Sequence, residues 1–137
     1  MGIVYADITL KNAGDVTDVG RGYIKEQDVR SVCVRALVDT GAGTLIINEE
    51  LMRQLGLGVK GLRRANLANN AREICKVTET VEVHWKDRMM TCQALAVPDS
   101  SEVLLGAIPL EDMDLIVNPV KQELEGAHGD EILTYIM

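Results

Sequence analysis

A single aspartate at the end of an apolar segment is the clearest candidate for chemistry in this chain. Asp39 follows the mostly apolar run 33–38, and Thr40 and Gly41 then turn the chain sharply. Such a run is typical of a buried strand, so the sequence places a carboxylate where a strand leaves the core and enters a tight glycine turn. Burying a carboxylate costs free energy unless it has partners or takes part in a reaction. We therefore identify Asp39 as the candidate catalytic residue.

A second motif stands later in the chain and strengthens this interpretation. Residues 102–106 read Glu-Val-Leu-Leu-Gly, and a segment with one proline, 107–111, follows. Residues 37–42 and 102–111 together resemble the retropepsin-like aspartic proteases, and cellular or prokaryotic members of that family more than viral ones. The active-site motif of this family is two apolar residues, Asp, Thr or Ser, Gly, and Ala or Ser. The resemblance covers roughly residues 30–120. The alternative is that Asp39 only caps a turn and that residues 104–105 are an ordinary core strand.

The resemblance implies a reaction that needs two carboxyl groups. One activates a water molecule and the other protonates the leaving nitrogen of a peptide bond. The chain contains one Asp-Thr-Gly, at Asp39, and is too short for two such lobes. A two-fold axis between two copies would supply the second Asp39, so the resemblance implies an endopeptidase that is active only as a homodimer and acts on an extended peptide or protein.

The resemblance also assigns roles to the neighbours of Asp39. Thr40 matches a residue whose hydroxyl bonds across the dimer, Gly41 lets the substrate backbone approach, and Ala42 completes the active-site turn. The element behind the two aspartates is expected at Leu104, Leu105 and Gly106. A flap that closes over the substrate is expected at Ala68, Asn69, Asn70 and Ala71.

Two departures from viral members concern the dimer. Viral enzymes carry an Asp shortly after the motif and an Arg directly after the later glycine, and these two side chains pair. Gly43 and Ala107 take their places here. The dimer must therefore be braced in another way. The predicted flap tip also has asparagines in place of the viral Gly-Gly.

The pattern of apolar residues predicts an all-β fold, a small closed or partly closed β-barrel with one or two short helices, formed by a single domain over residues 1–137. Strands are expected at 3–10, 45–47, 62–68, 72–78, 81–85, 89–97 and 132–137, with a strand pair or one bent strand at 23–38. A helix is expected at 48–56, where Asn48 suits the N-cap and Gly56 the C′ position, and another at 110–113 after Pro109. Residues 12–21 are expected to form a loop.

Composition narrows the setting. Three cysteines, Cys33, Cys75 and Cys92, have no paired spacing, so we expect free thiols, a cytoplasmic protein, and no metal or other cofactor. No segment resembles a signal peptide or a transmembrane helix, so no membrane association is expected.

The net charge of −7 is unevenly distributed. Residues 60–76 carry five basic side chains and one acidic side chain, whereas residues 111–131 carry seven acids and one base. The basic segment could steer an acidic partner, although a solvated strand face is the simpler interpretation.

Two rival functions remain open at this point. One is a non-catalytic retropepsin-like dimer that binds an extended peptide or serves as a dimerisation module. The other is a nucleic-acid-binding barrel that uses residues 60–76, which the negative net charge and the scarcity of aromatic residues disfavour. We therefore expect no nucleic-acid partner.

Overall fold

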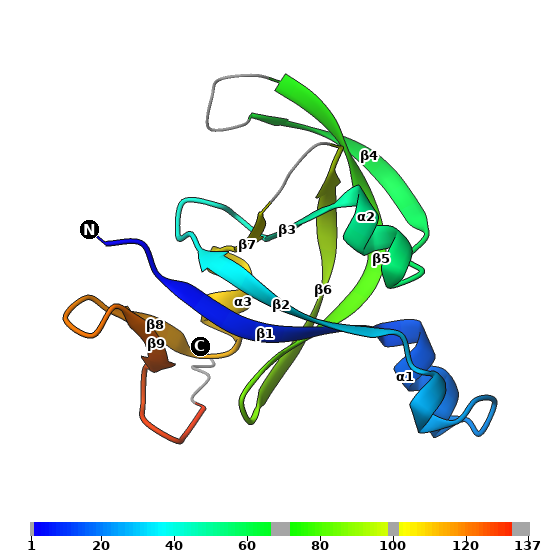
Figure 1. Cartoon of the computed structure of the whole chain (residues 1–137), viewed down its shortest axis with the longest axis horizontal. Coiled ribbons are helices and arrows are strands. Elements are labelled where there is room, and N and C mark those ends of the chain that lie inside the picture. Colours follow the sequence, from blue (N-terminus) through cyan, green and yellow to red (C-terminus); the bar gives the residue numbers. More distant parts are fainter. Residues whose placement is uncertain (1, 67–71, 99–101, 133–137) are drawn as a thin grey trace, which may run out of the picture.

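The computed structural model describes residues 2–66, 72–98 and 102–132, and its chain is dominated by strands (Figure 1). In chain order its elements are β1 (Tyr5–Asn12), α1 (Ala13–Gly20), the 3-10 turn η1 (Glu26–Asp28), β2 (Ser31–Val38), β3 (Leu45–Asn48), α2 (Glu49–Gln54), β4 (Val59–Asn66), β5 (Arg72–Trp85), β6 (Arg88–Val97), β7 (Val103–Leu105), α3 (Ala107–Asp112), β8 (Leu115–Asn118) and β9 (Glu123–Gly126).

Six of the strands close into a barrel. Their order is β1-β2-β7-β3-β6-β5, and β5 pairs with β1 to complete the ring. Two contacts in the ring are parallel, β2 with β7 and β3 with β6, and the others are antiparallel. β4 extends the sheet beyond β5, and β8 and β9 form a separate hairpin. The prediction of a small closed β-barrel is confirmed, with three short helices where one or two were expected.

The barrel interior is filled mainly by aliphatic side chains, together with methionines and Trp85, and the chain has no Phe. Alternate residues of β1 point inward, so Ala6, Ile8 and Leu10 are buried while their neighbours are more exposed. The same cluster includes Leu45 and Leu105, which lie opposite each other on β3 and β7. The strands that flank the candidate site are therefore anchored in the main core.

The helix expected at 48–56 is confirmed, and its signals are local. The Asn48 side chain accepts a hydrogen bond from the Leu51 N–H at 2.7 Å, and Gly56 adopts a positive φ of 64° just after the helix. The second expected helix exists but begins earlier, at Ala107. Pro109 then lies in its first turn, where a missing N–H costs no intrahelical bond.

The expectation of a loop at 12–21 was wrong, because α1 occupies residues 13–20. The polar residues that suggested a loop hold this helix in place. Asn12 caps it by accepting from the Asp15 N–H, and donates to the carbonyl of Leu55 at 2.8 Å. Asp15 is buried and accepts three hydrogen bonds from the backbone and side chain of Arg30, each at 2.9 Å. Because these partners are far apart in sequence, local sequence patterns could not predict the helix.

Other boundaries also differ. Residues 23–38 were expected to form a strand pair or one bent strand, but they contain η1 followed by the single strand β2. The Lys25 N–H bonds to the Asp28 carboxylate at the start of this turn. β4 begins at Val59, and β5 runs continuously through the two segments expected at 72–78 and 81–85. Ile132 lies outside any strand, and residues 133–137 of the expected last strand lie outside the described residues.

The Asp15–Arg30 pair leads to a pH-dependent prediction. Hydrogen bonds from Arg30 lower the pKa of Asp15, so this carboxylate stabilises the fold above its unfolded-state pKa, and the stabilisation is lost as pH falls through the folded-state pKa. We expect Asp15→Asn to lower the free energy of unfolding at pH 7 by about 1–2 kcal/mol, with a difference from wild type that shrinks below about pH 4. Urea denaturation at several pH values measures this.

Asp18→Asn is the matched control, because Asp18 lies on the same helix but forms no ion pair among the described residues. An equal loss in both variants would contradict the role given to the Asp15–Arg30 pair.

Candidate functional site

The end of β2 carries the candidate aspartate, and β7 fixes its position. The two strands are parallel, with Val38 opposite Leu105. The pairing continues one residue further, since the Asp39 N–H donates to the Leu105 carbonyl at 3.0 Å. On its other side β2 is held by β1, and the Val38 N–H donates to the Val4 carbonyl at 2.8 Å. Asp39 is thus held at the end of a strand that is paired on both sides.

The Asp39 side chain is partly buried and only partly engaged. One carboxylate oxygen, Oδ1, accepts a hydrogen bond from the Gly41 N–H at 2.9 Å. The other oxygen, Oδ2, has no hydrogen-bond partner within the described residues. A carboxylate with one oxygen oriented by the backbone and the other available can accept a proton from water.

The turn after Asp39 is bonded to the start of α3. Within the turn, the Ala42 N–H donates to the Asp39 carbonyl at 3.1 Å. The first two amides of α3 then donate to the turn, Ala107 to the Ala42 carbonyl at 2.8 Å and Ile108 to the Gly43 carbonyl at 3.2 Å. Positions 43 and 107, which the sequence analysis singled out, therefore lie beside each other. Backbone hydrogen bonds join the two segments here, where viral enzymes are expected to use a pair of charged side chains.

Gly106 makes this close approach possible. A Cβ at this position would lie 2.6 Å from the Ala42 carbonyl oxygen and 2.8 Å from the Thr44 nitrogen, distances that real Cβ atoms do not adopt. Because the obstacles are backbone atoms, they cannot move aside as a flexible side chain would. The Leu104-Leu105-Gly106 element therefore packs directly behind the Asp39 turn, with Leu105 fully buried.

The remaining predicted residues of the turn lie on its outer side. Thr40 and Gly41 are exposed, and Ala42 is half-buried. The Thr40 hydroxyl makes no hydrogen bond to any described residue, so it is available to a partner outside this chain. Gly41 does not adopt a positive φ. Its contribution to the site is that it places no side chain beside the Asp39 carboxylate.

The predicted flap residues Ala68, Asn69, Asn70 and Ala71 lie outside the described residues. The strands on either side are described: β4 and β5 pair antiparallel from Val59–Thr78 to Asn66–Arg72. Strands are therefore present on both sides of the predicted flap, and the role of residues 68–71 stays a prediction.

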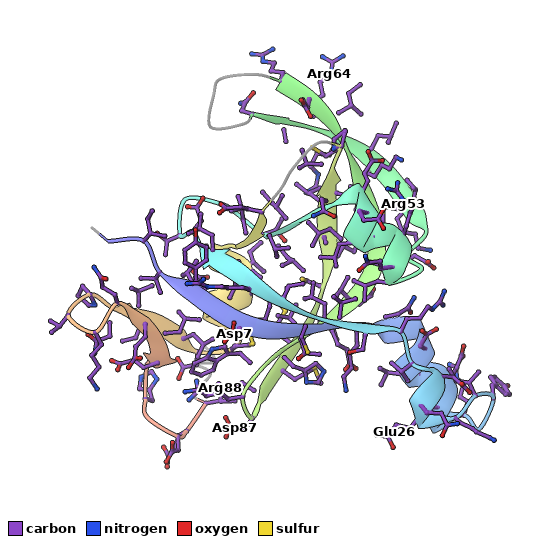
Figure 2. The ribbon with its side chains drawn as sticks, viewed as in Figure 1. Asp7, Glu26, Arg53, Arg64, Asp87 and Arg88 are labelled. Atoms are coloured by element: carbon purple, nitrogen blue, oxygen red, sulfur yellow. The ribbon has the colours of Figure 1, made fainter. Side chains whose placement is uncertain are left out.

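A buried arginine that sequence reasoning missed supports α3 from the far side. Arg88 is only 3% exposed and donates to the carbonyls of Met113 and Asp114 at the end of α3, both at 2.7 Å. It also donates to the Gly129 carbonyl, beyond the β8–β9 hairpin. Figure 2 labels Arg88 beside β8 and β9. Nothing in the local sequence distinguishes this arginine from exposed ones, because its acceptors are distant backbone carbonyls.

Neither a thiolate at Cys75 or Cys92 nor a metal site is supported among the described residues. Burial raises the pKa of the Cys92 thiol to about 11, with help from Asp112, and burial also raises the pKa of Cys75, so neither forms a ready thiolate. The two histidines each pair with one carboxylate, His84 with Glu82 and His128 with Asp114. In the described parts of the chain, no three His, Cys, Asp or Glu side chains gather in a way that could hold a metal ion. Among the same residues, no helix combines the length and apolarity needed to cross a membrane.

A family model and a solved structure match this fold, and a further structure can be aligned with it. Residues 26–112, more than half of the chain, match the family model described as "gag-polyprotein putative aspartyl protease". The retroviral protease-like domain of Ddi1 from Leishmania major is similar in structure, with a TM-score of 0.58 and 16% sequence identity over 96% of this chain and 91% of that chain. A retropepsin-like aspartic protease from Rickettsia conorii aligns with a TM-score of 0.46 and 16% identity over 85% of this chain and 83% of that chain. No curated protein sequence matches the chain.

The tight contact at Gly106 can be tested directly. We expect Gly106→Ala to lower the free energy of unfolding by about 1–3 kcal/mol, because the added methyl group must push the 42–44 turn away from α3. Gly43→Ala is the matched control: it lies in the same turn, and a Cβ there would meet nothing within 4 Å. Chemical denaturation of both variants measures the difference. Equal stability of the two variants would show that the turn does not depend on this contact.

Proposed function

The chain belongs to the gag-type, retropepsin-like family of aspartyl proteases. We propose that it is an aspartic endopeptidase and that it is active as a homodimer. In this proposal the two Asp39 carboxyl groups face each other across a two-fold axis. The substrate is an extended peptide or protein segment.

The proposed reaction uses the two carboxyl groups in different protonation states. The ionised carboxylate takes a proton from a water molecule, whose oxygen attacks the carbonyl carbon of the peptide bond. The protonated carboxyl group gives its proton to the leaving nitrogen as the carbon–nitrogen bond breaks. The products are a carboxylic acid and an amine, and the dyad regains one shared proton. No metal or covalent intermediate is needed.

The observation that carries this proposal is the state of the Asp39 carboxylate. It lies on a turn that β7 and α3 hold through backbone bonds, with one oxygen oriented by Gly41 and the other without a partner among the described residues. The rigid turn holds the Asp39 carboxylate in one orientation and leaves one oxygen available. This arrangement favours a close approach to the Asp39 of a second copy, because little conformational freedom is lost when the two meet.

The surroundings of the turn support dimerisation. Ile108, whose N–H donates to the turn, is 55% exposed. Ile3 is 69% exposed, and its neighbour Val4 pairs with the end of β2. Exposed apolar side chains beside an unpartnered polar hydroxyl, that of Thr40, are typical of a protein interface. All three cysteines are free, which supports the further proposal of a reducing, cytoplasmic location.

Replacing the carboxylate tests catalysis. We expect Asp39→Asn to lower peptidase activity on the order of a thousand-fold while leaving the fold and the dimer intact, because the amide has the same shape but cannot act as the base. Asp87→Asn, in the exposed turn between β5 and β6, is the control and should keep wild-type activity. The assay follows cleavage of a peptide library by mass spectrometry.

An Asp39→Asn variant as active as wild type would remove Asp39 from the mechanism. A wild-type protein that forms dimers but cleaves nothing in the library would favour the non-catalytic peptide-binding dimer.

Replacing Thr40 tests the dimer. We expect wild-type protein to sediment at twice 15.0 kDa, and Thr40→Ala to raise the dimer dissociation constant. Loss of two symmetry-related hydroxyl bonds, at about 1 kcal/mol each, corresponds to about a thirty-fold increase. Sedimentation velocity over a concentration series measures it. Thr91→Ala, at an exposed position of β6, should leave the constant unchanged. An unchanged constant in Thr40→Ala would refute the role given to this hydroxyl.

A further inference from the structure

The outer edge of β4 is an open strand edge. β4 is the last strand of the seven-stranded sheet, and among the described residues it pairs with β5 alone. No backbone hydrogen bond within the described residues engages its other edge. An edge of this length, eight residues, leaves a row of N–H and C=O groups able to pair with another extended chain.

This edge is also basic, in a chain whose net charge is −7. Lys60, Arg63 and Arg64 lie on β4, and Arg72 lies at the start of β5. None of these four side chains forms an ion pair within the described part of the chain, whereas the nearby Lys76 pairs with Glu49. Figure 2 labels Arg64 near the far end of the β4–β5 hairpin, at the opposite side of the molecule from β8 and β9. The positive charge is therefore available to a partner.

Apolar side chains are exposed on the same arm. Leu62 is 69% exposed and Ile74 is 56% exposed. In the β4–β5 register Leu62 lies opposite Lys76, and Arg64 lies opposite Ile74, so these side chains share the outer face of the hairpin. Charge alone would suffice to keep an edge strand from aggregating. The addition of exposed Leu62 and Ile74 between the cations is better explained by a surface that another molecule covers.

We propose that the outer edge of β4 binds an acidic, extended segment of another protein, which adds to the sheet as a further strand. Backbone pairing would supply the affinity and the side chains the specificity, as in other cases of strand addition. The segment is expected to carry an apolar residue beside Leu62 and acidic residues beside Arg63 and Arg64, on its two faces. β4 leads into the predicted flap but is not a neighbour of β2, whose end carries Asp39, in the sheet. The test below measures binding and not cleavage, so it is independent of the proposed peptidase activity.

The favoured occupant follows from the chemistry of the arm. Nucleic acid would also seek the cations, but neither β4 nor residues 72–78 contain an aromatic side chain on which bases could stack. The open backbone edge and the exposed aliphatic residues have no use in binding a phosphate chain, whereas both match an extended acidic peptide.

A peptide-binding experiment tests the charge. The probe is a fluorescent eight-residue peptide of alternating threonine and valine with two central glutamates, and its control has glutamine in place of the glutamates. We expect the full-length protein to bind the glutamate peptide, and Arg63→Glu/Arg64→Glu to weaken binding by about ten-fold or more, since two cross-strand ion pairs become repulsive.

The matched control is Arg21→Glu/Lys25→Glu. It makes the same charge change at exposed positions between α1 and β2, and it should bind as wild type does. Because all four substituted side chains are exposed, circular dichroism should show that both double variants fold.

Hydrogen exchange tests the strand pairing. Addition of the glutamate peptide should slow amide exchange at alternate residues of 59–66, where N–H groups face the open edge. Binding without this protection would overturn the proposal, because ionic contact alone does not order the edge. Equal binding of the glutamine peptide, or tighter binding of an oligothymidylate with the same dependence on Arg63 and Arg64, would overturn it as well.

Discussion

The site depends on one close backbone contact, that between Gly106 and the turn that follows Asp39. A side chain at position 106 would collide with the backbone of Ala42 and Thr44. Its absence lets the first amides of α3 reach the carbonyls of Ala42 and Gly43, and lets β7 run parallel to β2 up to Asp39. The barrel on one side and α3 on the other then position a carboxylate that needs no side-chain partner to hold its place. Arg88 stabilises α3 at its other end, where the guanidinium donates hydrogen bonds to backbone carbonyls.

In the proposed reaction, a single chain supplies one of the two carboxyl groups. In the described residues only a backbone N–H engages the Asp39 carboxylate, and the hydroxyl of Thr40 beside it is unpaired. At the surface of a monomer neither group would have a partner in the protein, whereas at the proposed two-fold axis each could bind its counterpart from the second copy. The backbone bonds between the turn and α3 also suggest how such a dimer could do without a pair of charged side chains at positions 43 and 107: the turn is stiffened within each copy. Stiffness reduces the entropy that is lost when two turns meet.

The distribution of charge gives the molecule two unlike ends. The β4–β5 arm is basic, and the segment from α3 through β9 is acidic. At the acidic end, Asp114 pairs with His128, and the Glu125 carboxylate accepts a hydrogen bond from Asn118. The cations of β4 are not engaged in this way, and they lie along an edge whose backbone is also open. On β4, cations that form no ion pair within the described residues coincide with an open strand edge.

Features with local causes could be predicted from the sequence alone. The apolar run, aspartate and glycine at 33–41 specify a strand that ends in a tight turn, and Asn48 and Gly56 specify both ends of α2, because caps and turns depend on residues a few positions apart. The alternation of apolar residues was enough to indicate a barrel. Tertiary structure decided what depends on distant partners. Asn12 and Asp15 became a helix cap and a buried ion-pair partner only because Leu55 and Arg30 come beside them. Arg88 became a buried support for α3, and β4 an open edge, through strand order, which no local pattern encodes. Hydrogen bonds and packing act over a few ångströms in space, so residues far apart in sequence acquire their roles only when the chain has folded.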